Sequence, residues 1–337
     1  MRLLLFLSGE HPTLPAAEAL AAAEALGAGA RVVHRDEQVL VCESDAQPEA
    51  LAERLGMCHF VAEHLFSCGC SVREITARAE GLEAEFEGSF AVRVRRVGGR
   101  CRGLCTSELA AAIGRRLVSS RRRVNLESPQ HLFVGIASGR FHFGILRAKV
   151  DRSSYRRRSP HLRPYFRPGS MKPALARAVV NLARVREGAR FADPFCGSGG
   201  LLIEAGLLGA RVYGFDVDAR AVRGALENLR WCGLSGRVER ADARELWRSY
   251  REYFHAIACD PPYGISASTG RSSLQKLYQE ALTSIHRMLM KGAYACVLSP
   301  ERVELESLAE EAGFSVEEMH SERVHASLVR RIAVLRK

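Results

Sequence analysis

Residues 260–263 bring a carboxylate, two prolines and an aromatic ring together in four consecutive positions. They follow an apolar run, residues 253–259, that is typical of a buried strand. Because proline lacks an N–H and restricts the backbone, the carbonyls of Asp260 and Pro261 are not taken up by a continuing helix or sheet. Together with the carboxylate and the flat ring of Tyr263, these acceptors suit a planar ligand that offers an NH2 group, such as a nucleobase. A rigid turn after a strand is the alternative interpretation.

Three further aspartates end predicted strands in the same part of the chain. Asp193 precedes a turn containing Gly197 and Gly199, where glycine allows a ligand to approach backbone N–H groups at the start of a helix. Asp216 follows about twenty residues later, a position that suits the hydroxyls of a ribose. Asp242 ends a third strand and could accept an adenine amino group. Each acid alone is explained equally well as a helix cap, but the set predicts S-adenosylmethionine, which has a cationic centre and no pyrophosphate.

The order of strands and helices predicts how these acids are positioned. From residue 169 to 337, strands and helices alternate strictly, which indicates a doubly wound, mostly parallel Rossmann-like sheet with the acids at one edge. Residues 1–60 are predicted to form a small α+β unit of ferredoxin-like type, and residues 61–150 a second α+β unit. Residues 151–168, rich in proline and basic side chains, are predicted to be a basic linker or ordered arm. The fold class is therefore α/β with α+β domains before the main sheet.

Positive charge is concentrated in the middle of the chain. The net charge is +11, but it divides into −9 for residues 1–88, +17 for residues 89–172 and +3 for residues 173–337. Few acids offset these arginines, and the guanidinium fork suits bidentate contact with phosphate. Aromatic residues in the same stretch could stack on bases. The block predicts a nucleic-acid surface. Its candidate RNA-binding residues are Arg95, Arg96, Arg122, Arg156, Arg157 and Arg158.

Composition also bears on location and cofactors. No apolar run approaches the ~20 residues of a membrane span, and residues 3–7 resemble a first strand more than a signal peptide, so the protein is predicted to be cytoplasmic. The ten cysteines do not have the paired spacing of a zinc site, so reduced thiols and no metal are predicted. The sequence is compatible with a monomer and leaves open the need for a small activator subunit.

The motifs resemble those of a known family. "DPFCGSGG" (193–200) with "DPPYG" (260–264) is similar to the class I amino-methyltransferases. The whole layout, with "RPYFRPGSMKP" (163–173) and "HASLVRRIAVL" (325–335), resembles the archaeal tRNA guanosine-10 N2-methyltransferases, which carry an RNA-binding THUMP domain. The resemblance is strong over residues 160–337, and over residues 1–150 it is one of layout only. It implies that residues 61–150 are the THUMP domain and that tRNA is the partner.

The resemblance also implies roles for individual residues. Asp260 and the Pro261 carbonyl would accept from the guanine N2 amino group, with Pro262 fixing the turn and Tyr263 stacking on the base. The expected cofactor-binding residues are Ser170, Met171, Asp193, Phe195, Gly197, Gly199, Asp216, Asp242 and Asp260. The expected product at position 10 is m2G, and the addition of a second methyl group to give m2,2G stays open from the sequence.

Three other functions stay open from the sequence. A DNA adenine N6-methyltransferase also uses Asp-Pro-Pro-Tyr. Enzymes that methylate guanosine in the tRNA acceptor stem tend to have Asn-Leu-Pro at this position, so Asp260 favours the first group. An RNA-binding protein without catalysis would explain the basic block but would leave the four strand-end aspartates without a role.

Overall fold

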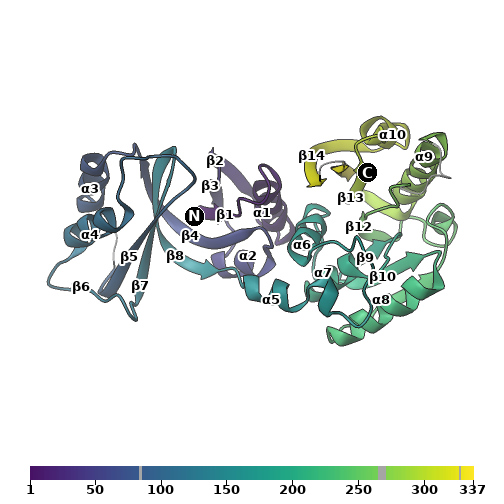
Figure 1. The fold of residues 1–337 in the computed structure, drawn as a ribbon, viewed down its shortest axis with the longest axis horizontal. Helices are drawn as coiled ribbons and strands as arrows, with labels where there is room; N and C mark the ends of the chain where they lie inside the picture. The colour runs from purple at the N-terminus through teal and green to yellow at the C-terminus, as the bar shows by residue number, and fades with distance from the viewer. Residues whose placement is uncertain (83–85, 265–270, 326–327) are drawn as a thin grey trace. The chain divides into compact units, whose positions relative to one another are not determined.

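A computed structural model describes residues 1–82, 86–264, 271–325 and 328–337. The chain forms two compact units (Figure 1). The N-terminal unit consists of residues 1–16, 26–53 and 57–151, and the C-terminal unit of residues 17–25, 54–56 and 152–337. Two short segments from early in the chain therefore belong to the C-terminal unit.

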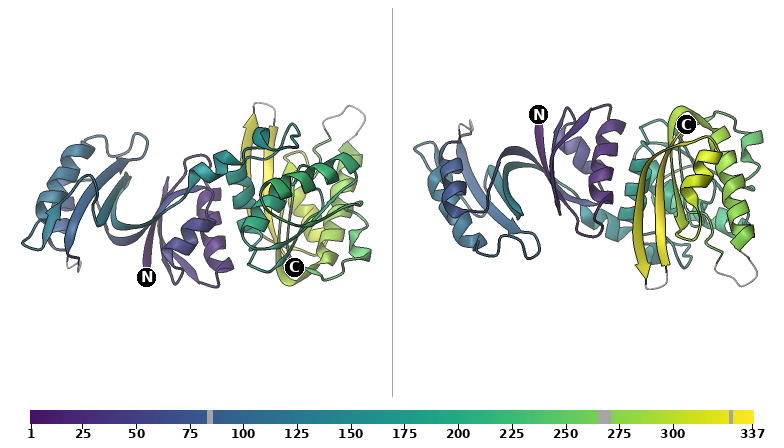
Figure 2. Two further views of the ribbon diagram at one scale, coloured as in Figure 1. Left: turned by 90° about the horizontal axis from the view of Figure 1, so that it is seen from below. Right: turned by 90° about the horizontal axis from the view of Figure 1, so that it is seen from above.

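The N-terminal unit is built on one eight-stranded sheet, in the order β2-β3-β1-β4-β8-β7-β5-β6, which twists strongly (Figure 2). Most neighbours are antiparallel, but β5 runs parallel to both β6 and β7. The strands are β1 Arg2–Leu7, β2 Ala30–Asp36, β3 Val39–Ser44, β4 Cys58–Cys68, β5 Gly88–Arg96, β6 Arg122–Val124, β7 His131–Ser138 and β8 Arg140–Lys149. The helices are α1 Leu14–Ala25, α2 Pro48–Arg54, α3 Val72–Glu80 and α4 Thr106–Leu117.

The predicted division of the first 150 residues differs from the structure. The boundary between residues 60 and 61 falls inside β4, which pairs with β1 on one side and β8 on the other. One hydrophobic cluster combines residues from both predicted domains, among them Leu4, Val41 and Ile136. Local periodicity identified the elements but could not show that long strands join them into one sheet.

Two cysteines of this unit form a disulfide, which the sequence analysis did not predict. Cys70, just after β4, is bonded to Cys101, which lies 31 residues further along the chain, in the loop after β5. The other eight cysteines are free thiols, and Cys105 is the exposed one among them. The prediction that all the cysteines are reduced is therefore wrong at this pair, because spacing along the sequence does not report proximity in space.

The C-terminal unit contains a seven-stranded sheet in the order β11-β10-β9-β12-β13-β15-β14. The pairs from β11 to β13 are parallel, while β15 runs antiparallel between β13 and β14. This arrangement confirms the predicted doubly wound, mostly parallel sheet. The strands are β9 Arg190–Asp193, β10 Arg211–Asp216, β11 Arg237–Arg240, β12 Phe254–Cys259, β13 Leu289–Pro300, β14 Ser315–His325 and β15 Leu328–Arg336.

Helices cover both faces of this sheet (Figure 2). One face holds a large apolar core in which Phe215, Ile257 and Tyr278 are buried between the sheet and α9 and α10. The helices are α5 Arg152–Arg157, α6 Pro173–Leu182, α7 Gly200–Leu207, α8 Ala219–Trp231, α9 Arg271–Met288 and α10 Leu305–Glu311, with 3-10 helices at Pro160–Leu162 and Leu246–Arg248. Within the described residues, no helix combines the length and apolar character required to cross a membrane.

The predicted linker, residues 151–168, is ordered and carries buried ion pairs. Arg158 donates to Glu204 at 2.7 and 2.9 Å, and Arg177 donates to the same carboxylate at 3.0 Å. The side chain of Glu204 is fully buried. Further along, the backbone of Tyr165 exchanges hydrogen bonds of 3.0 and 2.9 Å with the side chain of Asn228 in α8. These contacts attach the segment to the C-terminal unit.

Candidate active site

The predicted site lies where the order of parallel strands reverses. β9 and β12 are neighbours at the centre of the sheet, and the chain winds outward from them in opposite directions. In open α/β sheets, ligands bind outside the carboxyl ends of the strands at this switch point. Asp193 is the last residue of β9, and Asp260 directly follows β12. The structure therefore brings these two predicted acids to the same edge.

The glycine-rich turn after β9 has the backbone that the sequence predicts. Gly197 and Gly199 have φ values of +51° and +78°, which strongly favour glycine. An added Cβ at Gly199 would also stand 3.2 Å from the Cβ of Ala225 in α8. Helix α7 begins immediately afterwards at Gly200. Within the turn, the N–H of Gly197 donates to Asp216 and the N–H of Gly199 donates to the Cys196 carbonyl. The two glycines thus set the path of the chain into the positive end of α7.

Asp193 is a buried acid with the character of a cation-binding group. Its exposed fraction is only 2%, and one oxygen accepts from the N–H of Phe195 at 3.0 Å. Burial raises the pKa of Asp193 well above its usual range, and the nearby charges of Asp216 and Asp260 add to the effect. A cationic ligand would stabilise the ionised form, so the site fits a group that carries an ammonium.

Asp216 and Asp242 occupy different surroundings. Asp216 ends β10 and accepts from the N–H groups of Gly197 (3.0 Å) and Asp218 (2.9 Å), so it also holds the glycine-rich turn in place. Asp242 lies two residues beyond the end of β11 and forms a 2.6 Å ion pair with Arg244. That ion pair holds the pKa of Asp242 below its usual value. The third acid is therefore at the expected edge but is not a strand residue.

Asp260, Tyr263 and Arg330 form a compact polar cluster. The Tyr263 hydroxyl donates to Asp260 at 2.6 Å and accepts from Arg330 Nε at 2.7 Å, and Arg330 Nη2 lies 3.7 Å from the other Asp260 oxygen. Burial raises the pKa of Asp260, although Arg330 and the Tyr263 hydroxyl oppose this effect. Tyr278 donates weakly to the Pro261 carbonyl at 3.4 Å, and Pro262 is exposed. The orientation of Tyr263 is thus set by its hydroxyl.

Arg330 was not singled out from the sequence, although it lies within the quoted stretch 325–335. Because β15 is antiparallel to β13, the start of β15 lies at the edge where the parallel strands end, and Arg330 pairs with Pro300 there. On its other side, Arg330 donates to Glu322 of β14 at 3.2 Å. Arg302 also contacts the loop, donating to the carbonyls of Tyr263 and Gly264. An isolated arginine in a strand pattern gives no signal of this role.

The remaining predicted cofactor residues lie beside the glycine-rich turn. The Ser170 hydroxyl donates to the Arg167 carbonyl at 2.6 Å and lies 3.0 Å from the Ser198 hydroxyl. Met171 and Phe195 are both half-buried. The segment "PGSMKP" (168–173) is thereby joined to the turn that follows β9.

The predicted RNA-binding arginines do not form one cluster. Arg95 and Arg96 are exposed at the end of β5, whereas Arg122 pairs with Gly88 at the start of that strand and its guanidinium lies over the Phe86 ring. The three predicted RNA-binding arginines of the 151–168 segment also differ in their surroundings. Arg156 and Arg157 are exposed, and Arg158 is engaged with buried Glu204. Arg156 and Arg157 are therefore more accessible to RNA than Arg158 is.

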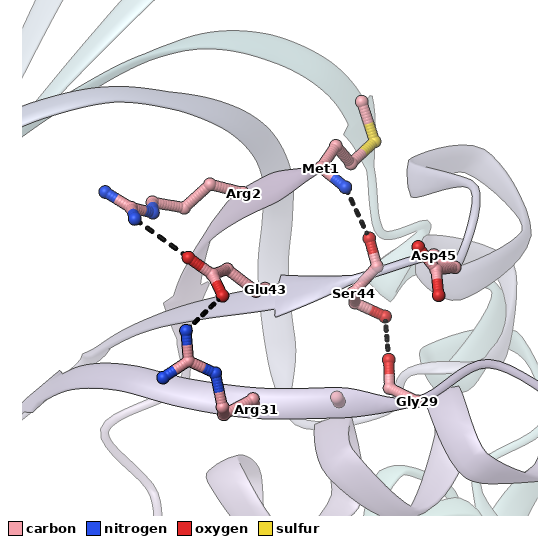
Figure 3. Close-up of a pocket in the computed structure, with 8 residues that line it drawn as sticks. Met1, Arg2, Gly29, Arg31, Glu43, Ser44 and Asp45 are labelled. Atoms are coloured by element: carbon pink, nitrogen blue, oxygen red, sulfur yellow. Dashed lines mark hydrogen bonds and ion pairs between the residues drawn. The ribbon is translucent and has the colours of Figure 1, made fainter.

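A separate surface hollow at the start of β1 has no comparable chemistry. Figure 3 shows Glu43 between Arg2 and Arg31, with its charge paired to both. The amino group of Met1 donates to the Ser44 carbonyl at 2.9 Å in the same hollow. These paired groups thus hold neighbouring strands together.

The sheet order and the acids at its switch point define a class I methyltransferase, and residues 160–332 match the RMKL-like methyltransferase domain family (UPF0020). The chain is 38% identical to a tRNA (guanine(10)-N2)-dimethyltransferase of Methanothermobacter thermautotrophicus over 82% of each protein. It is 34% identical to the enzyme of the same name from Pyrococcus abyssi, over 69% of this chain and 71% of that protein. The structure is also similar to the crystal structure of TrmN from Thermus thermophilus. The structural alignment covers the full length of both chains, with a TM-score of 0.54 and 26% sequence identity. The chain belongs to the tRNA (guanine(10)-N2)-methyltransferase family.

Proposed function

We propose that this protein transfers a methyl group from S-adenosylmethionine to the exocyclic N2 of guanosine 10 in tRNA. The observation that carries the proposal is the position of Asp260, a half-buried acceptor at the switch point of the sheet and beside the glycine-rich turn. The relatives named above act on this nitrogen according to their names, and tRNA is the partner that the proposal requires.

The chain offers groups that fit the cofactor. The buried carboxylate of Asp193 would accept from the amino group of the methionine portion, beside the glycine-rich turn. Asp216 would accept from the ribose hydroxyls and Asp242 from the adenine amino group. The other residues that we assign to this site are Ser170, Met171, Phe195, Gly197 and Gly199. When bound, the cofactor supplies an electrophilic methyl group on a sulfonium.

The groups after β12 would orient the base. Asp260 and the Pro261 carbonyl accept from the N2 amino group, which aims its lone pair and increases its electron density. Arg330 and the Tyr263 hydroxyl hold Asp260 in place. The face of the Tyr263 ring would stack on a base withdrawn from its helix. After methylation the nitrogen must lose one proton, and we assign Asp260 as the acceptor because burial raises its pKa.

Nucleoside mass spectrometry tests the proposed reaction. Purified protein and cofactor should convert a tRNA transcript to one containing m2G, followed by m2,2G if a second methyl is added. A transcript with adenosine at position 10 is the matched control and should remain unmodified. Methylation of that control at an acceptor-stem guanosine, or of adenine in duplex DNA, would overturn the assignment in favour of the corresponding alternative.

The rate should depend on pH through Asp260. The ionised form is the acceptor, so kcat should rise with pH through a pKa above the usual carboxylate value and then level off. Arg330→Gln removes the positive charge that opposes the raised pKa of Asp260, so the rising limb should move to higher pH. Measurements of kcat from about pH 4 to about pH 9 test this prediction. A rising limb at the same pH in Arg330→Gln as in the original chain would contradict it.

Asp216→Asn should weaken cofactor binding. The substitution keeps the size of the side chain but only one of its two acceptor oxygens, so one of the N–H groups of Gly197 and Asp218 also loses its partner. Loss of charged hydrogen bonds to the ribose should cost about 1.5–3 kcal/mol, or roughly 10- to 150-fold in Kd by calorimetry. Asp218→Asn, which changes the cap of α8, is the control and should bind normally. Equal affinity in both variants would remove Asp216 from the site.

Replacing Arg156 and Arg157 by alanine should weaken tRNA binding and reduce its salt dependence. Each lost phosphate contact should lower the slope of log K against log salt by about 0.7 to 0.9. The matched control is the double change Arg186→Ala and Arg211→Ala, which removes two exposed charges near the amino ends of β9 and β10. Identical slopes for both double variants, measured by filter binding, would mean that the arm does not contact RNA.

A further inference from the structure

A cluster of titratable side chains in the N-terminal unit has no part in the proposed reaction. His34 and Asp36 come from β2 and His142 from β8. A single oxygen, Asp36 Oδ2, lies 3.1 Å from His34 Nε2 and 3.0 Å from His142 Nε2. The three potential ligand atoms all lie within 4.8 Å of one another.

The strands that carry these residues are not neighbours. Three strands separate β2 from β8 in the sheet order, which would place them roughly 19 Å apart in a flat sheet at the usual strand spacing. In the structure the rings of His34 and His142 are 5.1 Å apart, because the sheet curls. Gly139, in the turn before β8, also approaches closely, since an added Cβ would lie 3.4 Å from Asp36 Oδ1. The cluster thus joins two hairpins that are distant along the sheet.

We propose that His34, Asp36 and His142 form a binding site for a divalent transition metal, with Zn2+ the best fit. Two imidazole nitrogens and a carboxylate oxygen are typical ligands of Zn2+, which then takes water as a fourth ligand. Tetrahedral Zn2+ with these bond lengths needs ligand atoms about 3.4 Å apart. The distances from Asp36 Oδ2 to the two histidine nitrogens, 3.1 and 3.0 Å, need to increase by only a few tenths of an ångström. His34 and Asp36 are 31% and 23% exposed, which gives an ion and a water access from solvent.

The surroundings of His142 support the assignment. Its side chain is fully buried, and its other ring nitrogen, Nδ1, lies 2.8 Å from the Ser67 hydroxyl. A metal-bound histidine is usually held in this way, with the second nitrogen fixed by a hydrogen bond. Ser67 in turn lies 2.7 Å from His64 Nε2.

Sequence spacing could not show this site. His34 and Asp36 are close in the chain, but the third ligand is 106 positions away from Asp36. A bound ion would connect the β2–β3 hairpin to the β7–β8 hairpin. It would therefore stabilise the curled sheet of the N-terminal unit and need not affect the methyltransferase chemistry.

Calorimetric titration of the full chain with Zn2+ at pH 7 tests the proposal. One ion should bind per chain, and His34→Ala should weaken this binding by about 100-fold or more. His34 is partly exposed, so its replacement should preserve folding. Ser67→Ala should cost about 10-fold through the loss of the supporting hydrogen bond. His161→Ala, which removes an exposed histidine of the C-terminal unit, is the matched control and should bind as the original chain does.

Cobalt(II) separates this site from cysteine thiols. The bound ion should show the visible absorption of tetrahedral nitrogen and oxygen ligation, without thiolate charge-transfer bands. The proposal is overturned if the chain binds no ion, if His34→Ala binds as tightly as the original chain, or if the spectrum shows thiolate ligands. Loss of binding in both His34→Ala and His161→Ala would equally contradict the assignment.

Discussion

Asp260→Ala should lower kcat for tRNA methylation by about 10²- to 10³-fold, equivalent to roughly 2.7–4 kcal/mol, while cofactor and tRNA still bind. The expected effect is on kcat more than on KM, because the amino nitrogen gains positive charge in the transition state, where an oriented carboxylate matters most. Single-turnover kinetics with saturating cofactor provide the measurement. The alternative interpretation, a rigid turn, predicts a less stable protein with normal turnover per folded molecule.

Two further substitutions sharpen this test. Asp260→Asn retains the size and one acceptor but loses the charge, so it should keep somewhat more activity than Asp260→Ala. Tyr263→Phe keeps the ring that would stack on the base and removes the hydroxyl that joins Asp260 to Arg330. A rate for Tyr263→Phe below that of the original chain would assign the hydroxyl a positioning role. A normal rate would leave stacking as the contribution of this residue.

Glu204→Gln should destabilise the C-terminal unit by about 3–5 kcal/mol. The substitution leaves two guanidinium groups, on Arg158 and Arg177, beside a neutral partner in a buried site, and an uncompensated buried charge is costly. The two tryptophans, Trp231 and Trp247, both lie in this unit. Their fluorescence during urea unfolding therefore reports its stability directly.

Glu227→Gln is the matched control, because it removes an exposed acid from α8 and should change stability by less than about 0.5 kcal/mol. A triple variant with Arg158→Met, Arg177→Met and Glu204→Leu should recover much of the loss, since an apolar set avoids the cost of burying charge. If Glu204→Gln unfolds at the same urea concentration as Glu227→Gln, the buried pairs contribute little.

The sequence predicted local features well. The ends of β9 and β10 fall at Asp193 and Asp216, and Asp260 follows β12 at once, because apolar runs and turn residues mark strand ends locally. The strand alternation also predicted the parallel sheet. These features depend on neighbouring residues, and a single sequence records them directly.

Features that depend on distant pairing were missed. Arg330 reaches Tyr263 across 67 positions only because β15 is inserted antiparallel beside β13. Arg158 belongs to a basic run that is obvious in the sequence, whereas its partner Glu204 is one acid within a predicted helix. Composition does not show that these two side chains form an ion pair. The same limitation applies to the Cys70–Cys101 disulfide. Charge and spacing along the chain do not report which side chains meet in space.

The early segments of the C-terminal unit bear on how the chain folds during synthesis. Glu18 is fully buried in the finished protein, and its carboxylate accepts from Asn181 at 2.9 Å, 163 positions later. At about 5–20 residues per second, a ribosome needs roughly 8 to 33 s to add that stretch. Throughout this interval the alanine-rich helix around Glu18 has been made but its final partner has not. The N-terminal unit needs no residue beyond 151 and can form first, whereas the C-terminal unit must recruit residues 17–25, which left the ribosome long before its other helices.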